Sequence, residues 1–195
     1  MVSDNISYYN KNAEQFIRNT KSADMSILQN IFIKHVAKGG RILDLGCGSG
    51  RDSLFFKHKH YDVYAIDASI EMVRHCQPLL GERVLHVTFE DYQSDILYDG
   101  IWACASLIHV DRAGLADIII KYTDMLKPCG VFLMSFKQKK DDYFADGRSF
   151  TCFTKQQLAV FLSKIDCFTH IEFIETRDVR PGREDEKWIS AIGQK

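Results

Sequence analysis

Three glycines and an acid form the pattern with the clearest chemical meaning. Gly46, Gly48 and Gly50 follow a short apolar run and precede a segment with helical spacing. Glycine permits tight turns and has no Cβ to obstruct a ligand, so such a turn can bring backbone N–H groups close to a bound molecule. Asp67 ends the next apolar run, where a carboxylate can accept both hydroxyls of a ribose. We therefore predict a nucleoside-binding site.

The spacing of the glycines distinguishes this turn from two other glycine-rich loops. A dinucleotide-binding loop reads GxGxxG, whereas this turn reads GxGxG, and the GK[ST] ending of a Walker loop is absent. Asp44, just before the first glycine, suits a ligand that has an ammonium group and no pyrophosphate. The alternative is an ordinary strand–helix turn whose glycines serve only packing.

Two runs around these residues resemble a known family. The run DLGCGSGRD, from Asp44 to Asp52, resembles motif I of the class I S-adenosylmethionine-dependent methyltransferases. The run AIDAS, which contains Asp67, resembles their acidic motif. The resemblance extends from about Tyr8 to Phe136 and favours the small-molecule, tellurite-resistance-like branch. It implies S-adenosyl-L-methionine as cofactor, S-adenosyl-L-homocysteine as product, and a Rossmann-like α/β fold with a doubly wound, mostly parallel sheet of seven strands.

The resemblance also implies roles for individual residues. Gly46, Cys47 and Gly48 would line the methionine part of the cofactor, and Asp67 would bind the ribose. The other expected cofactor contacts are Tyr9, Asp44, Ala68, Met72, Phe89, Glu90 and Ala105. Spacing does not decide which of Phe89, Glu90 and Asp91 lies at the edge of the adenine ring. Tyr9 would close over the cofactor, or else serve as a half-buried aromatic anchor.

Few residues are expected to act on the methyl acceptor, because methyl transfer depends mainly on alignment. His109 follows the predicted fourth strand and is the candidate general base, since its ordinary pKa lies near neutrality. The alternative is a packing or hydrogen-bonding histidine. Arg148 and Arg180 are expected to contact the substrate, because a guanidinium can hold a carboxylate or phosphate bidentately. The alternative is structural, with Arg148 and Asp178 or Glu184 forming surface ion pairs.

Helices and strands alternate along the chain, which is typical of an α/β fold with a mostly parallel sheet. The expected strands are 41–45, 61–66, 84–87, 100–105, 131–136, 168–174 and 187–192, the last two forming an antiparallel C-terminal hairpin. The expected helices are most of 1–38, 51–59, 70–77 (closed by Pro78), 112–126 and 154–165. Residues 137–150 are predicted to be a polar loop whose lysines, beginning with Lys137, are solvated.

The expected organisation is a single methyltransferase domain over residues 1–195. It would consist of an N-terminal helical lid (1–38), a cofactor-binding core (39–136), and a substrate loop, helix and hairpin (137–195). The composition, with 46% hydrophobic and 26% charged residues, fits one globular domain with a core.

The sequence also limits the setting and partners of the protein. Six cysteines without a CxxC pair, and no signal-peptide pattern, predict a reducing, cytoplasmic location. No apolar run is long enough to span a membrane. His58 and His60 have no further ligand nearby, so no metal site is expected. No obligate protein partner is inferred.

The predicted function is methyl transfer to an unidentified acceptor, most simply a small molecule. The arginine-bearing turn near the C-terminus leaves a tRNA methyltransferase as an alternative. The net charge of −1 argues against a large surface that binds the phosphates of a nucleic acid. A non-catalytic nucleoside-binding module of the same fold is a second alternative, because fold does not fix function. An NAD-dependent enzyme is a third.

Overall fold

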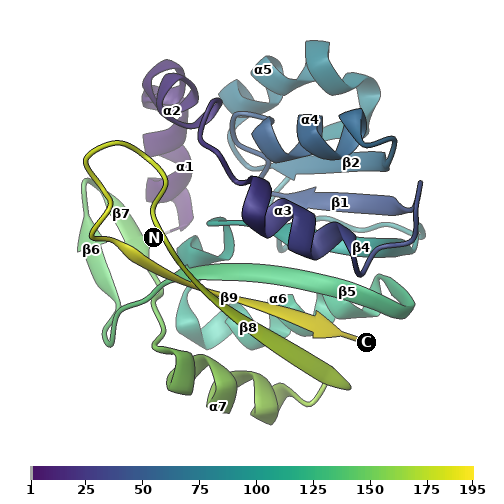
Figure 1. Cartoon of the computed structure of the whole chain (residues 1–195). Helices are drawn as coiled ribbons and strands as arrows, with labels where there is room; N and C mark the ends of the chain where they lie inside the picture. Colours follow the sequence, from purple (N-terminus) through teal and green to yellow (C-terminus); the bar gives the residue numbers. More distant parts are fainter. Residues whose placement is uncertain (1) are drawn as a thin grey trace.

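The chain folds around a seven-stranded sheet with helices on both faces (Figure 1). The computed structural model describes residues 2–195. The strands of this sheet are β1 (Arg41–Leu45), β2 (Asp62–Asp67), β3 (Val84–His86), β4 (Tyr98–Ala103), β5 (Leu126–Lys137), β8 (His170–Arg177) and β9 (Lys187–Gln194). Their order is β3-β2-β1-β4-β5-β9-β8. Strand β9 runs antiparallel to β5 and β8, and the other neighbours pair in parallel. The predicted fold and C-terminal hairpin are therefore confirmed.

The helices form two layers, as the alternation of side chains along each strand requires. They are α1 (Val2–Lys11), α2 (Ala13–Thr20), α3 (Ser26–Ile33), α4 (Arg51–His58), α5 (Ile70–Leu80), α6 (Arg112–Asp124) and α7 (Lys155–Ile165), with short 3-10 turns η1 (Gly81–Arg83) and η2 (Leu107–His109). In β1, Ile42 packs in a cluster with Leu28 of α3 and Phe56 of α4. The next residue, Leu43, packs in the cluster that contains Leu115 of α6. Both faces of the parallel sheet are thus covered.

Trp102 of β4 joins the core to the region below the glycine turn. Its ring makes edge contacts with Phe32 and Phe56, at centroid separations of 5.1 and 5.2 Å. Its indole N–H donates to the Asp52 carboxylate at 3.0 Å, and Gln29 of α3 donates to the same carboxylate at 2.6 Å. The buried carboxylate of Asp52 is therefore satisfied by the core beneath it.

The structure corrects several predicted element boundaries. The N-terminal segment forms three short helices rather than one long one. Helix α5 passes through Pro78 and ends at Leu80, and the capping residue Gly81 has a φ of +75°. Strand β4 ends before Ala105, which has a φ of +57°. Strand β5 begins at Leu126 and includes residues predicted as a turn.

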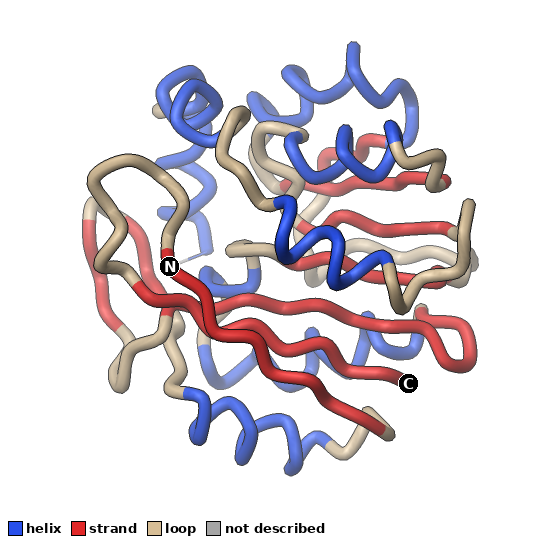
Figure 2. The backbone as a smooth tube through the Cα atoms, viewed as in Figure 1, coloured by secondary structure: helices blue, strands red, loops and turns tan. Residues whose placement is uncertain are grey.

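The predicted polar loop after β5 contains a small hairpin, β6 (Tyr143–Ala145) and β7 (Arg148–Phe150). Its two turn residues, Asp146 and Gly147, have φ values of +51° and +75°, as two-residue hairpin turns with matching twist require. The rings of Tyr143 and Phe150 stack across it at 4.7 Å. Figure 2 shows this hairpin apart from the main sheet, at the end from which the loop between β8 and β9 also extends.

Candidate active site

A cavity of about 460 Å³ opens beyond the carboxyl ends of β1, β2 and β4. Open α/β sheets bind their ligands in this position. The predicted site residues that line the cavity are Tyr9, Gly46, Cys47, Gly48, Asp67, Ala68, Met72, Phe89, Glu90, Ala105, His109, Arg148 and Arg180. The structure therefore brings together nearly all the residues that the sequence suggested, from elements far apart in the chain.

The glycine turn is shaped by contacts that leave no room for side chains. Gly46 has a φ of +72°, and a Cβ built on it would lie 2.6 Å from the Cβ of Ser106. Gly48 has a φ of +52°, and a Cβ there would lie 3.1 Å from the ring of Phe16. The backbone of the turn thus forms the cavity wall directly. Phe16, which sequence reasoning did not single out, lies on α2 and also contacts the ring of Tyr9 at 5.1 Å.

Asp67 presents a carboxylate to the cavity from the end of β2. One oxygen accepts the Gly48 N–H at 2.9 Å, and the other accepts the Ser69 N–H at 2.8 Å. Burial raises the pKa of Asp67, while these two hydrogen bonds oppose the shift. A carboxylate has about four acceptor positions, so each oxygen can still accept a hydroxyl from a ligand.

Asp44 lies beneath the turn rather than on the cavity wall. It is buried, and its carboxylate accepts the Ser53 hydroxyl at 2.6 Å. Burial and the nearby Asp52 raise the pKa of Asp44 to about 7. The structure places it outside the residues that line the cavity, so a direct contact with a ligand's ammonium group remains a prediction.

Arg51 and Asp52, at the start of α4, line the cavity where sequence reasoning assigned no role. The Arg51 guanidinium donates to both carboxylate oxygens of Asp52, at 2.9 and 2.6 Å. Because Asp52 is also held by Trp102 and Gln29, the arginine is fixed at the cavity floor. An Arg–Asp pair directly after a glycine turn was the available signal in the sequence.

Tyr9 and His109 meet inside the cavity. The Tyr9 hydroxyl lies 2.7 Å from His109 Nε2, and His109 Nδ1 lies 2.8 Å from the Ser149 carbonyl oxygen. A carbonyl only accepts, so Nδ1 carries the proton, Nε2 accepts, and the tyrosine hydroxyl donates. Burial, with smaller effects from the Arg148 and Lys137 charges, lowers the pKa of His109 to about 4. The imidazole is therefore neutral near pH 7.

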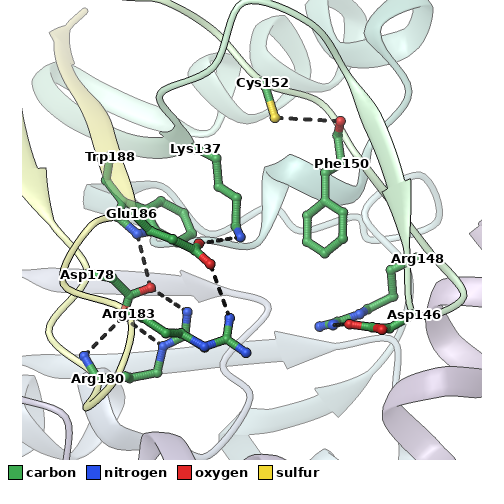
Figure 3. Close-up of polar contacts among 10 residues, drawn as sticks. All are labelled: Lys137, Asp146, Arg148, Phe150, Cys152, Asp178, Arg180, Arg183, Glu186 and Trp188. Carbon is green, nitrogen blue, oxygen red and sulfur yellow. Dashed lines mark hydrogen bonds and ion pairs between the residues drawn. The ribbon is translucent and has the colours of Figure 1, made fainter.

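Basic side chains gather at the other end of the cavity, around the hairpin and the β8–β9 loop. Lys137 is buried there and binds Glu186 at 2.5 Å, so the prediction that it is solvated was wrong. It continues the buried run of β5, and burial was not evident from the lysines and aspartates that follow it. Arg180 makes a two-pronged contact with Asp178, whose carboxylate also accepts the Trp188 N–H at 3.2 Å. Asp178 therefore pairs with Arg180, and Arg148 pairs instead with Asp146 (Figure 3).

Buried polar atoms without partners all point to this one cavity. Within residues 4–195, such side-chain atoms are Ser106 Oγ, Arg148 Nε and Ser190 Oγ. All three residues line the cavity. Buried polar groups are normally hydrogen-bonded, so the cavity is the place in the described structure where hydrogen-bonding capacity is left for a ligand. The same part of the chain has no group of three or more His, Cys, Asp or Glu side chains placed to hold a metal ion.

The chain is similar to methyltransferases in sequence and in structure. Residues 42–130 match a family model described as a methyltransferase domain. The structure is similar to 1,6-didemethyltoxoflavin-N1-methyltransferase from Burkholderia thailandensis, crystallised with bound 1,6-didemethyltoxoflavin and S-adenosylhomocysteine. That match has a TM-score of 0.79 and 22% identity, covering 99% of this chain and 88% of that one. No curated protein sequence matches the chain.

Two further solved structures show the same architecture. The N-methyltransferase NodS from Bradyrhizobium japonicum, in complex with S-adenosylhomocysteine, has a TM-score of 0.65 and 14% identity over 96% of this chain and 98% of that one. A methyltransferase from Archaeoglobus fulgidus has a TM-score of 0.73 and 15% identity over 96% and 100%. Residues 42–130 thus match a methyltransferase-domain model, and the chain has the fold of the class I S-adenosylmethionine-dependent methyltransferases. No helix within residues 2–195 is long and apolar enough to cross a bilayer.

Proposed function

We propose that this protein is an S-adenosylmethionine-dependent methyltransferase that acts on a small molecule. The observation that carries the proposal is the Asp67 carboxylate. It faces the cavity and accepts hydrogen bonds from the Gly48 and Ser69 N–H groups. Its oxygens can still accept hydrogen bonds from a ligand, beside a glycine turn whose backbone forms the cavity wall. The structurally similar proteins from Burkholderia thailandensis and Bradyrhizobium japonicum were crystallised with S-adenosylhomocysteine, which supports the same cofactor here.

The residues at this end of the cavity fit the parts of such a cofactor. Asp67 would accept the ribose hydroxyls, and Ala68, Met72 and Phe89 provide mostly apolar surface for the adenine. Gly46, Cys47 and Gly48 would lie along the methionine part. Ser106 Oγ, buried and without a partner, adds a free hydrogen-bonding group beside Gly46. Among the described residues, the charged groups at this end are Arg51, Asp52, Asp67 and Glu90. Their net negative charge suits a cofactor with a positively charged sulfonium.

When bound, the cofactor would supply a methyl group on positively charged sulfur. Transfer to a lone pair of the acceptor would leave the carbon–sulfur electron pair on sulfur and would release a proton from the acceptor. The protein must align the acceptor and provide a place for that proton. Neutral His109 can take one proton at Nε2, but Tyr9 occupies that position. We infer that Tyr9 Oη accepts the acceptor's proton while its own proton passes to His109 Nε2.

The α1 segment brings Tyr9 to this position and closes one side of the cavity. Asn5 donates to the His109 carbonyl at 3.4 Å and accepts the Ser149 N–H at 3.0 Å. Asn10 accepts the Ser69 hydroxyl at 2.7 Å. These contacts connect α1 to both the cofactor end and the hairpin. They support the proposal that the N-terminal helices act as a lid over the cofactor, with residues 137–195 contributing the substrate side of a single domain.

Calorimetric titration with S-adenosylhomocysteine, with NADH as the comparison ligand, tests the cofactor. Micromolar binding of the first and none of the second is expected. A folded protein that binds only NADH, or neither ligand, would overturn the proposal. A second assay would measure S-adenosylhomocysteine release from the labelled donor with a library of small acceptors. Tight cofactor binding without turnover on any acceptor or extract would instead support a non-catalytic module.

A further inference from the structure

We propose that the methyl acceptor is a small aromatic acid whose carboxylate or phosphate binds Arg148, with Lys137 and Arg183 nearby. This inference rests on the proposed function and adds the substrate class. Figure 3 shows Lys137, Arg148 and Arg183 directed from three different elements toward a common space beside Phe150. These elements are the end of β5, the hairpin strand β7 and the β8–β9 loop.

Charge is divided unevenly between the two ends of the cavity. Among the described residues, the cations that line the acceptor end are Lys137, Lys139, Arg148, Arg177, Arg180 and Arg183, and the carboxylates are Asp146, Asp178 and Glu186. The acceptor end therefore has an excess of positive charge, in a protein whose net charge is −1. The cofactor end has the opposite excess. A cavity arranged in this way suits a cationic cofactor and an anionic acceptor side by side.

Lys137 and Arg180 each bind a carboxylate at hydrogen-bonding distance, whereas the ion pair of Arg148 is longer and is made with an exposed carboxylate. Arg180 holds Asp178 through two N–H groups, and Lys137 binds Glu186 at 2.5 Å. The ion pair of Arg148 is with Asp146, at 3.4 Å, and the Asp146 side chain is 74% exposed. The Arg148 side chain is only 14% exposed, and its Nε is buried without a partner. Arg148 is thus a largely buried cation that keeps hydrogen-bonding capacity for an oxyanion.

The position of Arg148 is fixed before any ligand binds. Its guanidinium stacks on the ring of Tyr8 at 4.0 Å and lies 5.1 Å from the Phe150 ring centroid. The planar guanidinium is therefore held in one orientation, which favours bidentate binding of an oxyanion. Exposed Asp146 can turn away when a ligand's anion replaces it, because its carboxylate can be solvated.

Aromatic side chains surround the cations and favour a ring-bearing ligand. Tyr143, Phe150 and Trp188 all line this end of the cavity. The His109 ring contacts Phe150 at 5.1 Å, so a ligand held at Arg148 beside Phe150 lies next to the Tyr9–His109 pair. An anion bound at this point would orient the rest of the molecule toward the proposed site of methyl transfer. The buried position of Arg148 Nε favours a small ligand over the backbone of a nucleic acid.

The test measures how simple probes bind to the protein saturated with S-adenosylhomocysteine. Ligand-observed NMR or calorimetry detects the binding. The probes are benzoate, phenyl phosphate, neutral benzamide, inorganic phosphate and a mixed-sequence single-stranded RNA. Benzoate or phenyl phosphate should bind at least about tenfold more tightly than benzamide, the usual effect of a hydrogen-bonded charge. Comparing the two acids distinguishes a carboxylate from a phosphate. Inorganic phosphate should bind more weakly than phenyl phosphate.

Variants assign the effect to Arg148. Arg148→Gln should remove the preference for the acids, and Arg148→Lys should retain part of it. The control Arg74→Gln removes an exposed arginine from α5 and should leave all affinities unchanged. If Arg148→Gln does not fold, Lys137→Gln should still weaken the acids relative to benzamide.

The outcomes separate this proposal from the one on which it rests. Benzamide binding as tightly as both acids, or an acid preference that survives Arg148→Gln, would overturn the substrate class. Phosphate binding as tightly as phenyl phosphate would overturn the aromatic part. RNA binding that exceeds both acids and is lost in Arg148→Gln would replace it with a nucleic-acid substrate. An intact acid preference without any S-adenosylhomocysteine binding would overturn the methyltransferase function alone.

Discussion

The hydroxyl of Tyr9 donates a hydrogen bond to Nε2 of His109 across 2.7 Å, joining α1 to the turn after β4. The histidine that the sequence suggested as a base is thus covered by the tyrosine that the sequence suggested as a cofactor contact. Because the opposite nitrogen is held by the Ser149 carbonyl, the imidazole cannot turn to another partner without losing a hydrogen bond. Any proton that His109 receives must therefore come through Tyr9.

Replacing Tyr9 tests this route. Tyr9→Phe keeps the ring against Phe16 and removes the hydroxyl, so kcat should fall by about 10²–10⁴-fold, the usual contribution of a positioned acid–base group. Affinity for S-adenosylhomocysteine should change little. The control is Tyr8→Phe, which removes the hydroxyl one position earlier and keeps the ring that stacks on Arg148. Equal activity of the two variants would show that the Tyr9–His109 contact is only structural.

The buried histidine should make the protein sensitive to acid. Its pKa is lowered to about 4 from an ordinary 6.5, so the unfolded chain binds this proton at a higher pH than the folded chain. The free energy of unfolding should therefore decrease as the pH falls from about 6.5 to about 4, by up to about 3 kcal/mol from this group. Urea unfolding at several pH values, with His109→Gln as the comparison, measures the effect. Parallel pH profiles for the two proteins would contradict it.

Asp67 is expected to dominate the polar binding of the cofactor. Asp67→Ala should weaken S-adenosylhomocysteine binding by about 1.5–3 kcal/mol, the range for hydrogen bonds to a charged group. The control is Glu71→Ala, which removes an acid from the first turn of α5 that does not line the cavity. Calorimetry reports both affinities, and circular dichroism shows whether the fold is kept. Unchanged affinity in folded Asp67→Ala would mean that another residue binds the ribose.

Local patterns in the sequence predicted the fold and the cofactor end well. The β1 strand, the glycine turn and Asp67 lie close together in the chain, and their chemistry depends on backbone conformation that glycine and strand patterns reveal. The acceptor end was harder to predict. Lys137 is buried because β5 and β9 pair along their length, a contact between distant segments. The hairpin was missed although its Asp146-Gly147 pair is a hairpin signal, because the flanking strands are only three residues long.

Two glycines give opposite predictions for the same substitution. At Gly46 the backbone has a φ of +72° and an added Cβ would meet Ser106 at 2.6 Å, so Gly46→Ala should destabilise the turn and abolish cofactor binding. Gly114 lies within α6, with nothing near its Cβ position. Gly114→Ala should therefore stabilise the protein by about 0.5–1 kcal/mol. Thermal unfolding and cofactor titration of both variants check this. A stable Gly46→Ala that binds normally would show that the turn can relax.

Arg51 and Asp52 form an ion pair that is part of the cavity floor. Both side chains are largely buried, at 19% and 8% exposure, and Trp102 and Gln29 also donate to Asp52. Removing one partner leaves a buried charge without compensation, so Asp52→Ala should lower the free energy of unfolding by about 3–5 kcal/mol.

The double variant Arg51→Met with Asp52→Leu removes both charges and should recover part of that loss, because a buried pair contributes little net stability compared with apolar packing. The recovered protein should still bind the cofactor more weakly than the natural chain if Arg51 contacts it from the cavity floor. Urea unfolding of Arg51→Met, Asp52→Leu and the double variant gives the coupling energy. A double variant as unstable as Asp52→Ala would mean that Trp102 and Gln29, rather than Arg51, make Asp52 essential.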